Sequence, residues 1–361
     1  MKNKQLRRYL SAGALIAGLT VAALFAIPAH MPPFLDEDGR VLPDSIAVIE
    51  SVELNGVEQW LFIRGRNVNK PVLLFLHGGP GTPETAWLFH YNQSLADHFV
   101  VVAWEQRGAG KSYTPHIPAE SMTMEQFIAD AHALTQMLKE RFNQEKIYLV
   151  GHSWGTLLGM HTAYRHPHDY HALVSISQTA HAAREEALIY EWVLAQARQD
   201  DNAKAVRQLE ATGVPVEGRL SLADLSVKLK WVNHYGGGAF YGRNGFRDLV
   251  WVMLKSRVYT LKEKLLYFRG ESFSLEHLYG EVSAVNLFAE IPEVQLPVYF
   301  LHGRHDYQVP MEVARAYFDH LQAPHKAFIV FEQSAHGVLF EEPEKFQNVL
   351  VRQLLNGGQN E

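Results

Sequence analysis

The sequence predicts an α/β protein whose mainly parallel sheet is covered by helices on both faces. Two observations predict this class: short apolar runs alternate with helical patterns, and most of these runs are continuously apolar. Continuous runs are typical of parallel strands, which are buried on both faces. A chain of 361 residues with 47% hydrophobic residues has enough apolar side chains for one large folded core.

The first predicted element is a hairpin over residues 45–64, because Asn55-Gly56 separates two strand-like runs. Six more strands follow as the runs VLLFL (72–76), FVVVAWE (99–105), IYLVG (147–151), ALVSIS (172–177), VYFLHG (298–303) and KAFIVFE (326–332). Helical patterns over 124–142, 155–166, 312–321 and 344–355 lie between or after them. The alternation predicts crossover connections between parallel strands.

The alternation of strand-like runs and helical patterns is interrupted over residues 179–296. The segment has helical patterns and a glycine-rich turn at 234–245, but no obvious strand. We interpret it as a helical cap inserted over the carboxyl edge of the sheet. The predicted core therefore comprises residues 45–178 and 297–357, and the predicted cap comprises residues 179–296.

Residues 1–30 differ in composition from the rest of the chain. Four cationic residues precede an uncharged run from Leu10 to Ile27, about 18 residues or roughly 27 Å of helix. We expect a single membrane anchor followed by a linker at 31–44, with a cleaved signal peptide or a buried helix as alternatives. The positive flank predicts an extracytoplasmic location for the remainder, which would be secreted if the segment is cleaved.

Charge and cysteine content exclude several classes. The net charge is −6 and no long basic run occurs beyond the N-terminus, so nothing favours nucleic acid as a partner. The absence of cysteine excludes disulfides, thiolate metal sites and cysteine nucleophiles. The oligomeric state is left open.

The stretch GHSWG at 151–155 fits the pattern G-x-S-x-G between a strand and a helix. In this context the serine sits on a sharp turn and projects its hydroxyl beyond the sheet. Ser153 is therefore the predicted nucleophile, and it requires a neighbouring base.

A base and its orienting acid are expected later in the chain, in the order acid then histidine. Asp306 follows one strand and His336 follows the next, so both fall at the edge where ligands bind in α/β sheets. His336 would take the serine proton, and Asp306 would orient the imidazole. His302, His305 and Glu332 are weaker alternatives for these two roles.

The stretch HGGPG at 77–81 directly follows a buried strand. Acyl transfer needs N–H donors fixed where an oxyanion develops. We expect one donor at the N–H of Trp154 and the other at Gly79, with Gly78 as the alternative. Glycine here lets the main chain approach the reacting carbonyl.

The stretch WEQRGAGKS at 104–112 has no obvious direct role in chemistry. We assign Glu105 and Arg107 a supporting role, in which Arg107 would hold the HGGPG loop or a cap element by charge-assisted hydrogen bonds. The histidine-rich stretch at 160–171 lacks metal-binding spacing and is interpreted as a solvated helix end. No cofactor and no metal are implied.

Taken together, HGGPG, EQRGAGKS, GHSWGTLLG and GRHD resemble the proline iminopeptidase-like serine peptidases of the α/β-hydrolase superfamily, over roughly residues 45–355. The resemblance implies the α/β-hydrolase fold, a Ser153–Asp306–His336 triad and a cap that selects substrates. It also implies cap carboxylates that bind a free amino group, for which Glu185, Glu186 and Glu191 are available. Glu105 replaces the family's Asp, and His152 stands where a glycine is frequent.

Three functions are open on this basis. The first is a serine aminopeptidase that removes N-terminal residues, such as proline, from short peptides. The second is an esterase, amidase or lactonase that acts on a small non-peptide substrate. The third is a non-catalytic binding module on a hydrolase scaffold.

Overall fold

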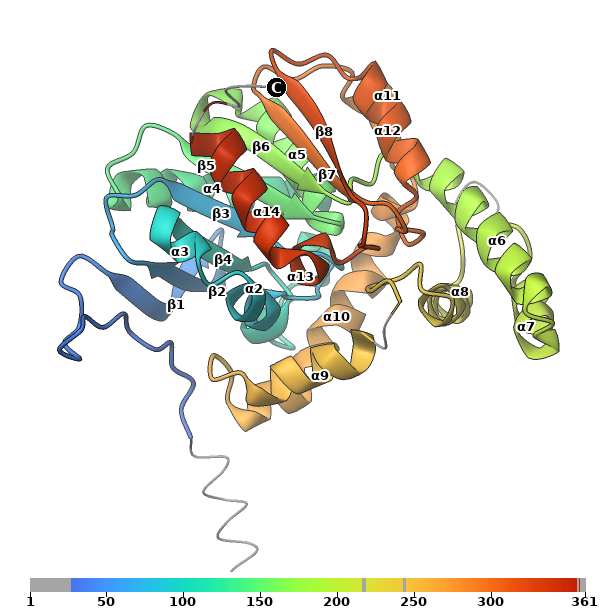
Figure 1. Ribbon diagram of the computed structural model, residues 1–361, viewed down its shortest axis with the longest axis horizontal. Coiled ribbons are helices and arrows are strands. Elements are labelled where there is room, and N and C mark those ends of the chain that lie inside the picture. The colour runs from blue at the N-terminus through green and yellow to red at the C-terminus, as the bar shows by residue number, and fades with distance from the viewer. Residues whose placement is uncertain (1–26, 216–218, 243–244, 356, 358–361) are drawn as a thin grey trace, which may run out of the picture.

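The computed structural model describes residues 27–215, 219–242, 245–355 and 357. Its sheet has eight strands in the order β1-β2-β4-β3-β5-β6-β7-β8 (Figure 1). These are β1 (Ile46–Leu54), β2 (Val57–Gly65), β3 (Val72–Leu76), β4 (Val100–Glu105), β5 (Ile147–His152), β6 (Tyr170–Ile176), β7 (Val298–Gly303) and β8 (Lys326–Phe331). β2 pairs antiparallel with β1 and β4, and the remaining pairs are parallel. The predicted mainly parallel sheet is confirmed.

Helices cover both faces of the sheet, as predicted. The α-helices are α2 (Thr85–Tyr91), α3 (Leu95–His98), α4 (Met124–Arg141), α5 (Trp154–Arg165), α6 (Ala182–Gln199), α7 (Ala203–Thr212), α8 (Leu222–His234), α9 (Gly245–Lys255), α10 (Leu261–Val282), α11 (Leu287–Glu290), α12 (Met311–His320), α13 (Val338–Glu341) and α14 (Pro343–Leu350). Single turns are η1 (Gly110–Ser112), η2 (Ala119–Ser121), η3 (Pro167–Asp169) and η4 (Val351–Leu355). Alternate residues of β3 divide the core: Leu74 and Leu76 pack with α4, α5 and α12, whereas Leu73 and Phe75 pack with α2, α3 and α14.

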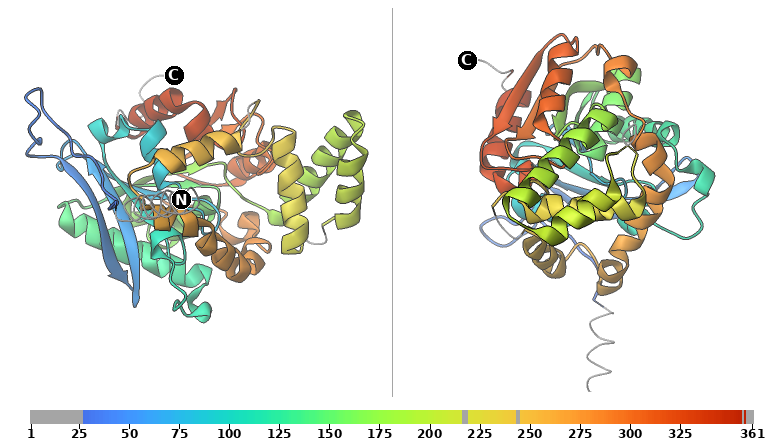
Figure 2. Two further views of the ribbon diagram at one scale, coloured as in Figure 1. Left: turned by 90° about the horizontal axis from the view of Figure 1, so that it is seen from below. Right: turned by 90° about the vertical axis from the view of Figure 1, so that its right-hand side faces the viewer.

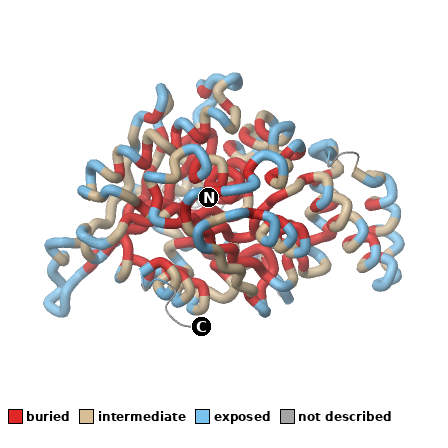
Figure 3. Tube along the Cα trace, turned by 90° about the horizontal axis from the view of Figure 1, so that it is seen from above, coloured by how far each residue is buried: buried red, intermediate tan, exposed pale blue. Residues whose placement is uncertain are grey.

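Between β6 and β7, the named elements of the described residues are all helices, α6 to α11. Figure 2 shows α6, α7 and α8 at the end of the molecule opposite the β1–β2 hairpin. These three helices bury a small apolar cluster of their own, which includes Ile189, Val193 and Trp231. In Figure 3, the buried segments gather at the centre of the molecule, where the sheet lies. The helical character expected for residues 179–296 is therefore present.

Helix α10 returns from this region to the core. The Ser274 hydroxyl donates a hydrogen bond to the carbonyl oxygen of Gly108, at 3.1 Å. A Cβ added at Gly81 would lie 2.5 Å from the Ser274 Cβ. The close approach of α10 therefore explains why Gly81 in HGGPG and Gly108 in EQRGAGKS have no side chain.

The predicted membrane anchor is contradicted. Within residues 27–215, 219–242, 245–355 and 357, no helix is both long and apolar enough to cross a membrane. The run at 10–27 that suggested an anchor lies outside the described residues except for Ile27. The membrane partner and the extracytoplasmic location that followed from it are withdrawn as well.

The segment expected to be a linker is attached to the domain. The N–H of His30 donates to the carbonyl oxygen of Arg257 between α9 and α10, at 2.9 Å. Met31 and Phe34 are buried, and the Arg64 guanidinium lies 4.5 Å from the centre of the Phe34 ring. Residues 30–34 are therefore packed against the fold.

Candidate active site

Ser153 occupies a sharp turn between β5 and α5, as the G-x-S-x-G pattern predicts. Its φ of 53° and ψ of −119° are unusual for a residue other than glycine. Its N–H donates to the carbonyl oxygen of Ile176 at the end of β6, at 3.0 Å. A Cβ at Gly151 would lie 2.2 Å from the Gly155 oxygen, and a Cβ at Gly155 would lie 2.1 Å from the oxygen of Leu76. Both glycines are therefore required by close approach of the main chain.

Asp306 and His336 meet beside this turn. His336 Nδ1 lies 2.9 Å from Asp306 Oδ2, and both side chains are buried. The other oxygen of Asp306 accepts the N–H groups of Gln308 and Val309 at 3.0 and 2.8 Å. Burial opposes ionisation of Asp306, but His336, the nearby His302 and the N–H of Val309 outweigh it, so its pKa lies below the ordinary value.

Ser153 and His336 line the same cavity. Within the described residues no hydrogen bond joins the Ser153 hydroxyl to the His336 imidazole. In unliganded enzymes such contacts are often long and shorten only when substrate binds. The arrangement thus provides a hydroxyl, a carboxylate and an imidazole after the ends of β5, β7 and β8.

The alternative acid and bases have other partners. His302 is buried on β7, with its Nε2 2.9 Å from the carbonyl oxygen of Val309. The ring of His305 stacks on Tyr241 at 3.5 Å between centroids. Glu332 is exposed and forms an ion pair with Arg304 at 2.8 Å. None of the three lines the cavity that contains Ser153.

The HGGPG loop lines the same cavity with Gly78 and Gly79. The N–H of Gly78 already donates to Glu84 Oε2 at 3.0 Å, which argues against Gly78 as the free donor. Gly79 has a φ of +115°, a region that side chains rarely allow. Trp154 is the first residue of α5, where N–H groups have no partner inside the helix. In the described part of the chain, no hydrogen bond is recorded for the N–H of Gly79 or Trp154.

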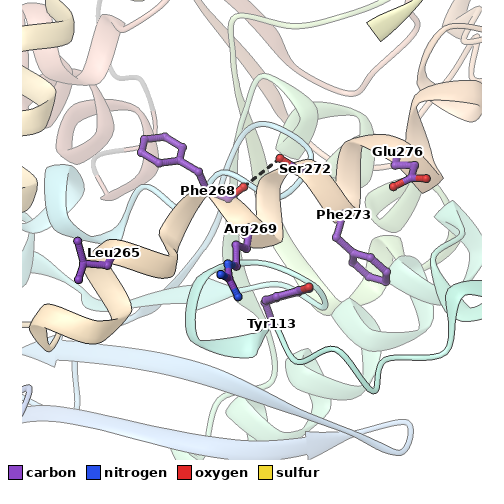
Figure 4. Close-up of a pocket in the computed structure, with 7 residues that line it drawn as sticks. All are labelled: Tyr113, Leu265, Phe268, Arg269, Ser272, Phe273 and Glu276. Atoms are coloured by element: carbon purple, nitrogen blue, oxygen red, sulfur yellow. Dashed lines mark hydrogen bonds between the residues drawn. The ribbon is translucent and has the colours of Figure 1, made fainter.

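A cavity of about 490 Å³ lies between this loop and helices α6, α8, α9 and α10. Its apolar lining includes Ile189, Leu225 and Met253, and four carboxylates also line it: Glu84, Glu185, Glu186 and Glu271. Glu191, the third carboxylate suggested by the sequence, is exposed on α6 and does not line the cavity. A second hollow of about 510 Å³ lies along α10, lined by residues of that helix and by Tyr113, and contains none of the predicted site residues (Figure 4).

The cavity carboxylates differ in their partners. Glu185 accepts the N–H groups of Ala180 and His181, and burial raises its pKa to about 7. Glu186 forms an ion pair with Lys228. Glu271 hydrogen-bonds to Thr82 beside the HGGPG loop, and burial raises its pKa. Among the described residues Glu271 has no ion-pair partner. No sequence motif marked it, because nothing in the sequence shows which face of α10 meets the loop.

Glu105 and Arg107 do not share one role. Glu105 is buried and accepts the Lys111 N–H at 2.6 Å and the Tyr259 hydroxyl, which links β4 to the segment before α10. Burial raises the pKa of Glu105 to about 7. Arg107 instead forms two hydrogen bonds with Asp130 on α4, at 2.9 and 3.0 Å. The expectation that Arg107 holds the HGGPG loop or a cap element is therefore wrong.

The link between the HGGPG and EQRGAGKS motifs is made by His77. Its Nδ1 lies 2.8 Å from the Gly78 oxygen, and its Nε2 lies 3.1 Å from the Gln106 N–H. One neighbour accepts and the other donates, which suits a neutral imidazole. Burial lowers the pKa of His77 to about 4, in agreement with this assignment.

The histidine-rich stretch brings His166 and Asp169 together with His132 of α4, and their ligand atoms lie within 4.8 Å of one another. The two imidazoles are stacked, with centroids 3.8 Å apart and planes inclined by 12°. Lone pairs in stacked rings point in parallel directions and do not converge on one ion. Asp169 also pairs with Lys139. The arrangement suits surface packing better than a metal site.

Residues 71–343 match the family model described as alpha/beta hydrolase fold. The chain belongs to the α/β-hydrolase family. This hydrolase is 34% identical to the probable aminopeptidase YbaC of Bacillus subtilis over 312 residues, which is 85% of this chain and 96% of that protein. It is 24% identical to the proline iminopeptidase of Heyndrickxia coagulans, over 78% of this chain and 88% of that protein. These relatives confirm the predicted resemblance to the proline iminopeptidase-like branch.

The fold of the hydrolase matches that of a solved relative. The crystal structure of the proline iminopeptidase of Mycobacterium smegmatis superposes with a TM-score of 0.65 and 20% identity, and covers 86% of this chain and 98% of its own. At this identity the likeness is one of fold. The predicted α/β-hydrolase fold is confirmed.

Proposed function

We propose that the chain is a serine aminopeptidase that removes N-terminal residues from short peptides. The observation that carries the proposal is the 2.9 Å contact between His336 Nδ1 and Asp306 Oδ2, beside the cavity that Ser153 lines. The names of the relatives supply the class of substrate, and the carboxylates of the cavity are compatible with a free amino group.

The proposed reaction is an acyl transfer. Because Asp306 occupies Nδ1 of His336, Nε2 is the nitrogen that takes the proton of Ser153. The serine oxygen then bonds to the substrate carbonyl carbon, and the resulting oxyanion accepts hydrogen bonds from the N–H groups of Gly79 and Trp154. His336 returns the proton to the leaving amine, and water repeats the sequence on the acyl-enzyme.

Glu271 is our proposed site for the amino group of the substrate. It lines the cavity, lies beside the HGGPG loop through Thr82, and forms no ion pair within the described residues. Glu186 is a weaker candidate because both of its oxygens bind Lys228, and Glu185 is weaker because its Oε1 already accepts two N–H groups. An ammonium group paired with Glu271 would favour its ionised form and offset the cost of its burial.

The division of the chain into a core (45–178 and 297–357) and a cap (179–296) is part of the proposal. Helices α6, α8, α9 and α10 line the cavity opposite the HGGPG loop. A cap in this position would limit the length of the acyl part and restrict the cavity to short substrates.

The test is a panel of aminoacyl arylamides, the same compounds with blocked amino groups, and simple acyl esters. We expect hydrolysis of the free aminoacyl compounds and its loss in Ser153→Ala. Glu271→Gln should raise KM for free amines and leave KM for blocked compounds unchanged. Glu276→Gln, an exposed position on the same helix, is the matched control. Equal rates on free and blocked compounds would contradict the aminopeptidase function.

The apolar lining of the cavity supports a second candidate, an esterase, amidase or lactonase for a small apolar acyl substrate. Ile189, Leu225 and Met253 offer no partner to a charged amine. In the same panel, this function predicts that acyl esters are the best substrates and that Glu271→Gln has no effect on them.

A further inference from the structure

The residue before the nucleophile, His152, has two hydrogen-bond acceptors as neighbours. Its Nδ1 lies 2.7 Å from Glu84 Oε1, and its Nε2 lies 2.9 Å from the carbonyl oxygen of His336. A carboxylate and a carbonyl both accept, so with Glu84 ionised both contacts are hydrogen bonds only if both ring nitrogens carry protons. His77, with one donor and one acceptor, needs a single ring proton.

The two protons are shared within a buried pair. They can reside on an imidazolium beside a carboxylate, or one can move to Glu84 while the ring stays neutral. In both arrangements His152 and Glu84 together hold two protons, and both side chains are buried. Losing one of these protons leaves an acceptor facing an acceptor without a hydrogen bond, which is costly in a buried site.

This pair connects the three parts of the proposed active site. The second oxygen of Glu84 accepts the N–H of Gly78, next to the proposed oxyanion donor at Gly79. His152 directly precedes Ser153, and its Nε2 contacts the main chain of His336. The oxyanion loop, the nucleophile and the base are thus linked through one carboxylate and one imidazole.

We propose that Glu84 and His152 are positioning residues, whose two shared protons hold the HGGPG loop and the His336 segment in register with Ser153. The proposal rests on the proposed serine hydrolase function and assigns the pair no contact with substrate. It predicts that activity falls at high pH, when the pair loses a proton.

The surroundings of His152 favour its charged form. Burial opposes protonation, but Glu84, the carbonyl of His336 and the more distant Asp306 outweigh it, and the pKa of His152 lies above its ordinary value. His302, His77 and Tyr267 are further titratable groups near the pair; burial lowers the pKa of both histidines and raises that of the tyrosine. The ring of His336 lies 4.8 Å from that of His152. The group whose loss of a proton would give the alkaline limb is therefore the Glu84–His152 pair.

Glu84→Gln is a direct test because a glutamine can form the same contacts while the pair holds one titratable proton instead of two. The amide oxygen can accept the N–H of Gly78, and the amide nitrogen can donate to Nδ1 of a neutral His152. The remaining ring N–H still donates to the carbonyl of His336. We expect Glu84→Gln to retain most of kcat at neutral pH and to lose the alkaline limb. Glu84→Ala, which rebuilds nothing, should lose about 10²-fold in kcat through misplacement of the reacting groups.

The measurements are kcat and kcat/KM between pH 5 and 10 for the wild type and both variants, each verified as folded by circular dichroism. An alkaline limb unchanged in Glu84→Gln would overturn the proposal, and so would full activity in Glu84→Ala. A second readout needs no activity: nitrogen NMR of the imidazoles in Ser153→Ala, with the His152 signals identified by their loss in His152→Gln. We expect two protons on the pair at pH 7 and one on His152 in Glu84→Gln. A single proton on the Glu84–His152 pair at pH 7 would overturn the inference. A wild type that holds two protons on the pair but is inactive would contradict only the hydrolase function.

Discussion

Replacement of Gly79 by alanine tests whether the N–H of this residue is an oxyanion donor. At the φ of +115° found for Gly79, a Cβ would lie 2.6 Å from the N of Gly81 and 2.7 Å from the N of Thr82. Both are main-chain atoms, so rotation of a side chain cannot relieve the contact. The peptide must turn, and the N–H of residue 79 turns away from the position of the oxyanion.

The expected loss follows from the role of that donor. Removal of one oxyanion donor costs about 2.7–4 kcal/mol of transition-state stabilisation, which is on the order of 10²–10³-fold in kcat. The matched control is Gly56→Ala in the β1–β2 turn, where φ is +79° and nothing lies within 4 Å of an added Cβ. Strain from positive φ is common to both variants and should cost about 1–3 kcal/mol of stability.

The assay compares kcat on the best arylamide with the free energy of unfolding from urea titration. We expect Gly56→Ala to lose stability and keep kcat, and Gly79→Ala to lose both. A folded Gly79→Ala variant with kcat within about threefold of the wild type would refute the assignment of this donor. Equal loss of kcat in both variants would show that strain alone explains the effect.

Three further predictions concern stability. Arg107→Met leaves the buried Asp130 without its guanidinium and should cost about 3–5 kcal/mol of the free energy of unfolding in urea, whereas Arg304→Met, in an exposed pair, should cost far less. Equal costs would contradict the structural role of the buried pair. Burial raises the pKa of Glu185 from 4.5 to about 7. Between pH 4.5 and about 7, the folded state therefore keeps a proton that the unfolded chain has released, so the free energy of unfolding falls as the pH rises through this range. Glu185→Gln should flatten that fall between pH 5 and 8, and an unchanged slope would refute it. Gly155→Ala places a Cβ 2.1 Å from a carbonyl oxygen of β3 and should abolish both soluble expression and activity, so a folded variant would refute the close packing.

The strands could be predicted because their signal is local. Runs such as VLLFL are apolar at every position, and all five of its residues are buried in β3. Likewise, the predicted turn at Asn55-Gly56 separates β1 from β2. The order of Ser153, Asp306 and His336 along the chain could also be predicted, since each residue lies shortly after the end of a strand.

The partners of buried charges could not be predicted in this way. Glu84 and His152 lie 68 residues apart, and no spacing rule connects them. Arg107 was expected to hold a loop at the site, yet its guanidinium reaches α4, because Asp130 points inward from that helix. A buried arginine is expected to pair with a carboxylate, but the sequence offers many carboxylates. Only the packing of α4 in the folded chain determines that Asp130 is the partner of Arg107.

The roles of the motif glycines could not be distinguished from the sequence either, because the same residue type meets three different structural requirements. Gly155 avoids the main chain of β3, and Gly81 makes room for Ser274 of α10. Gly79 combines a positive φ with a place in the lining of the cavity, and its N–H has no hydrogen-bond partner within the described residues. A substitution at the first should prevent folding, and one at the second should shift the position of α10. Only at the third should activity be lost well beyond stability, so mutational profiles can distinguish glycines that the sequence presents as equivalent.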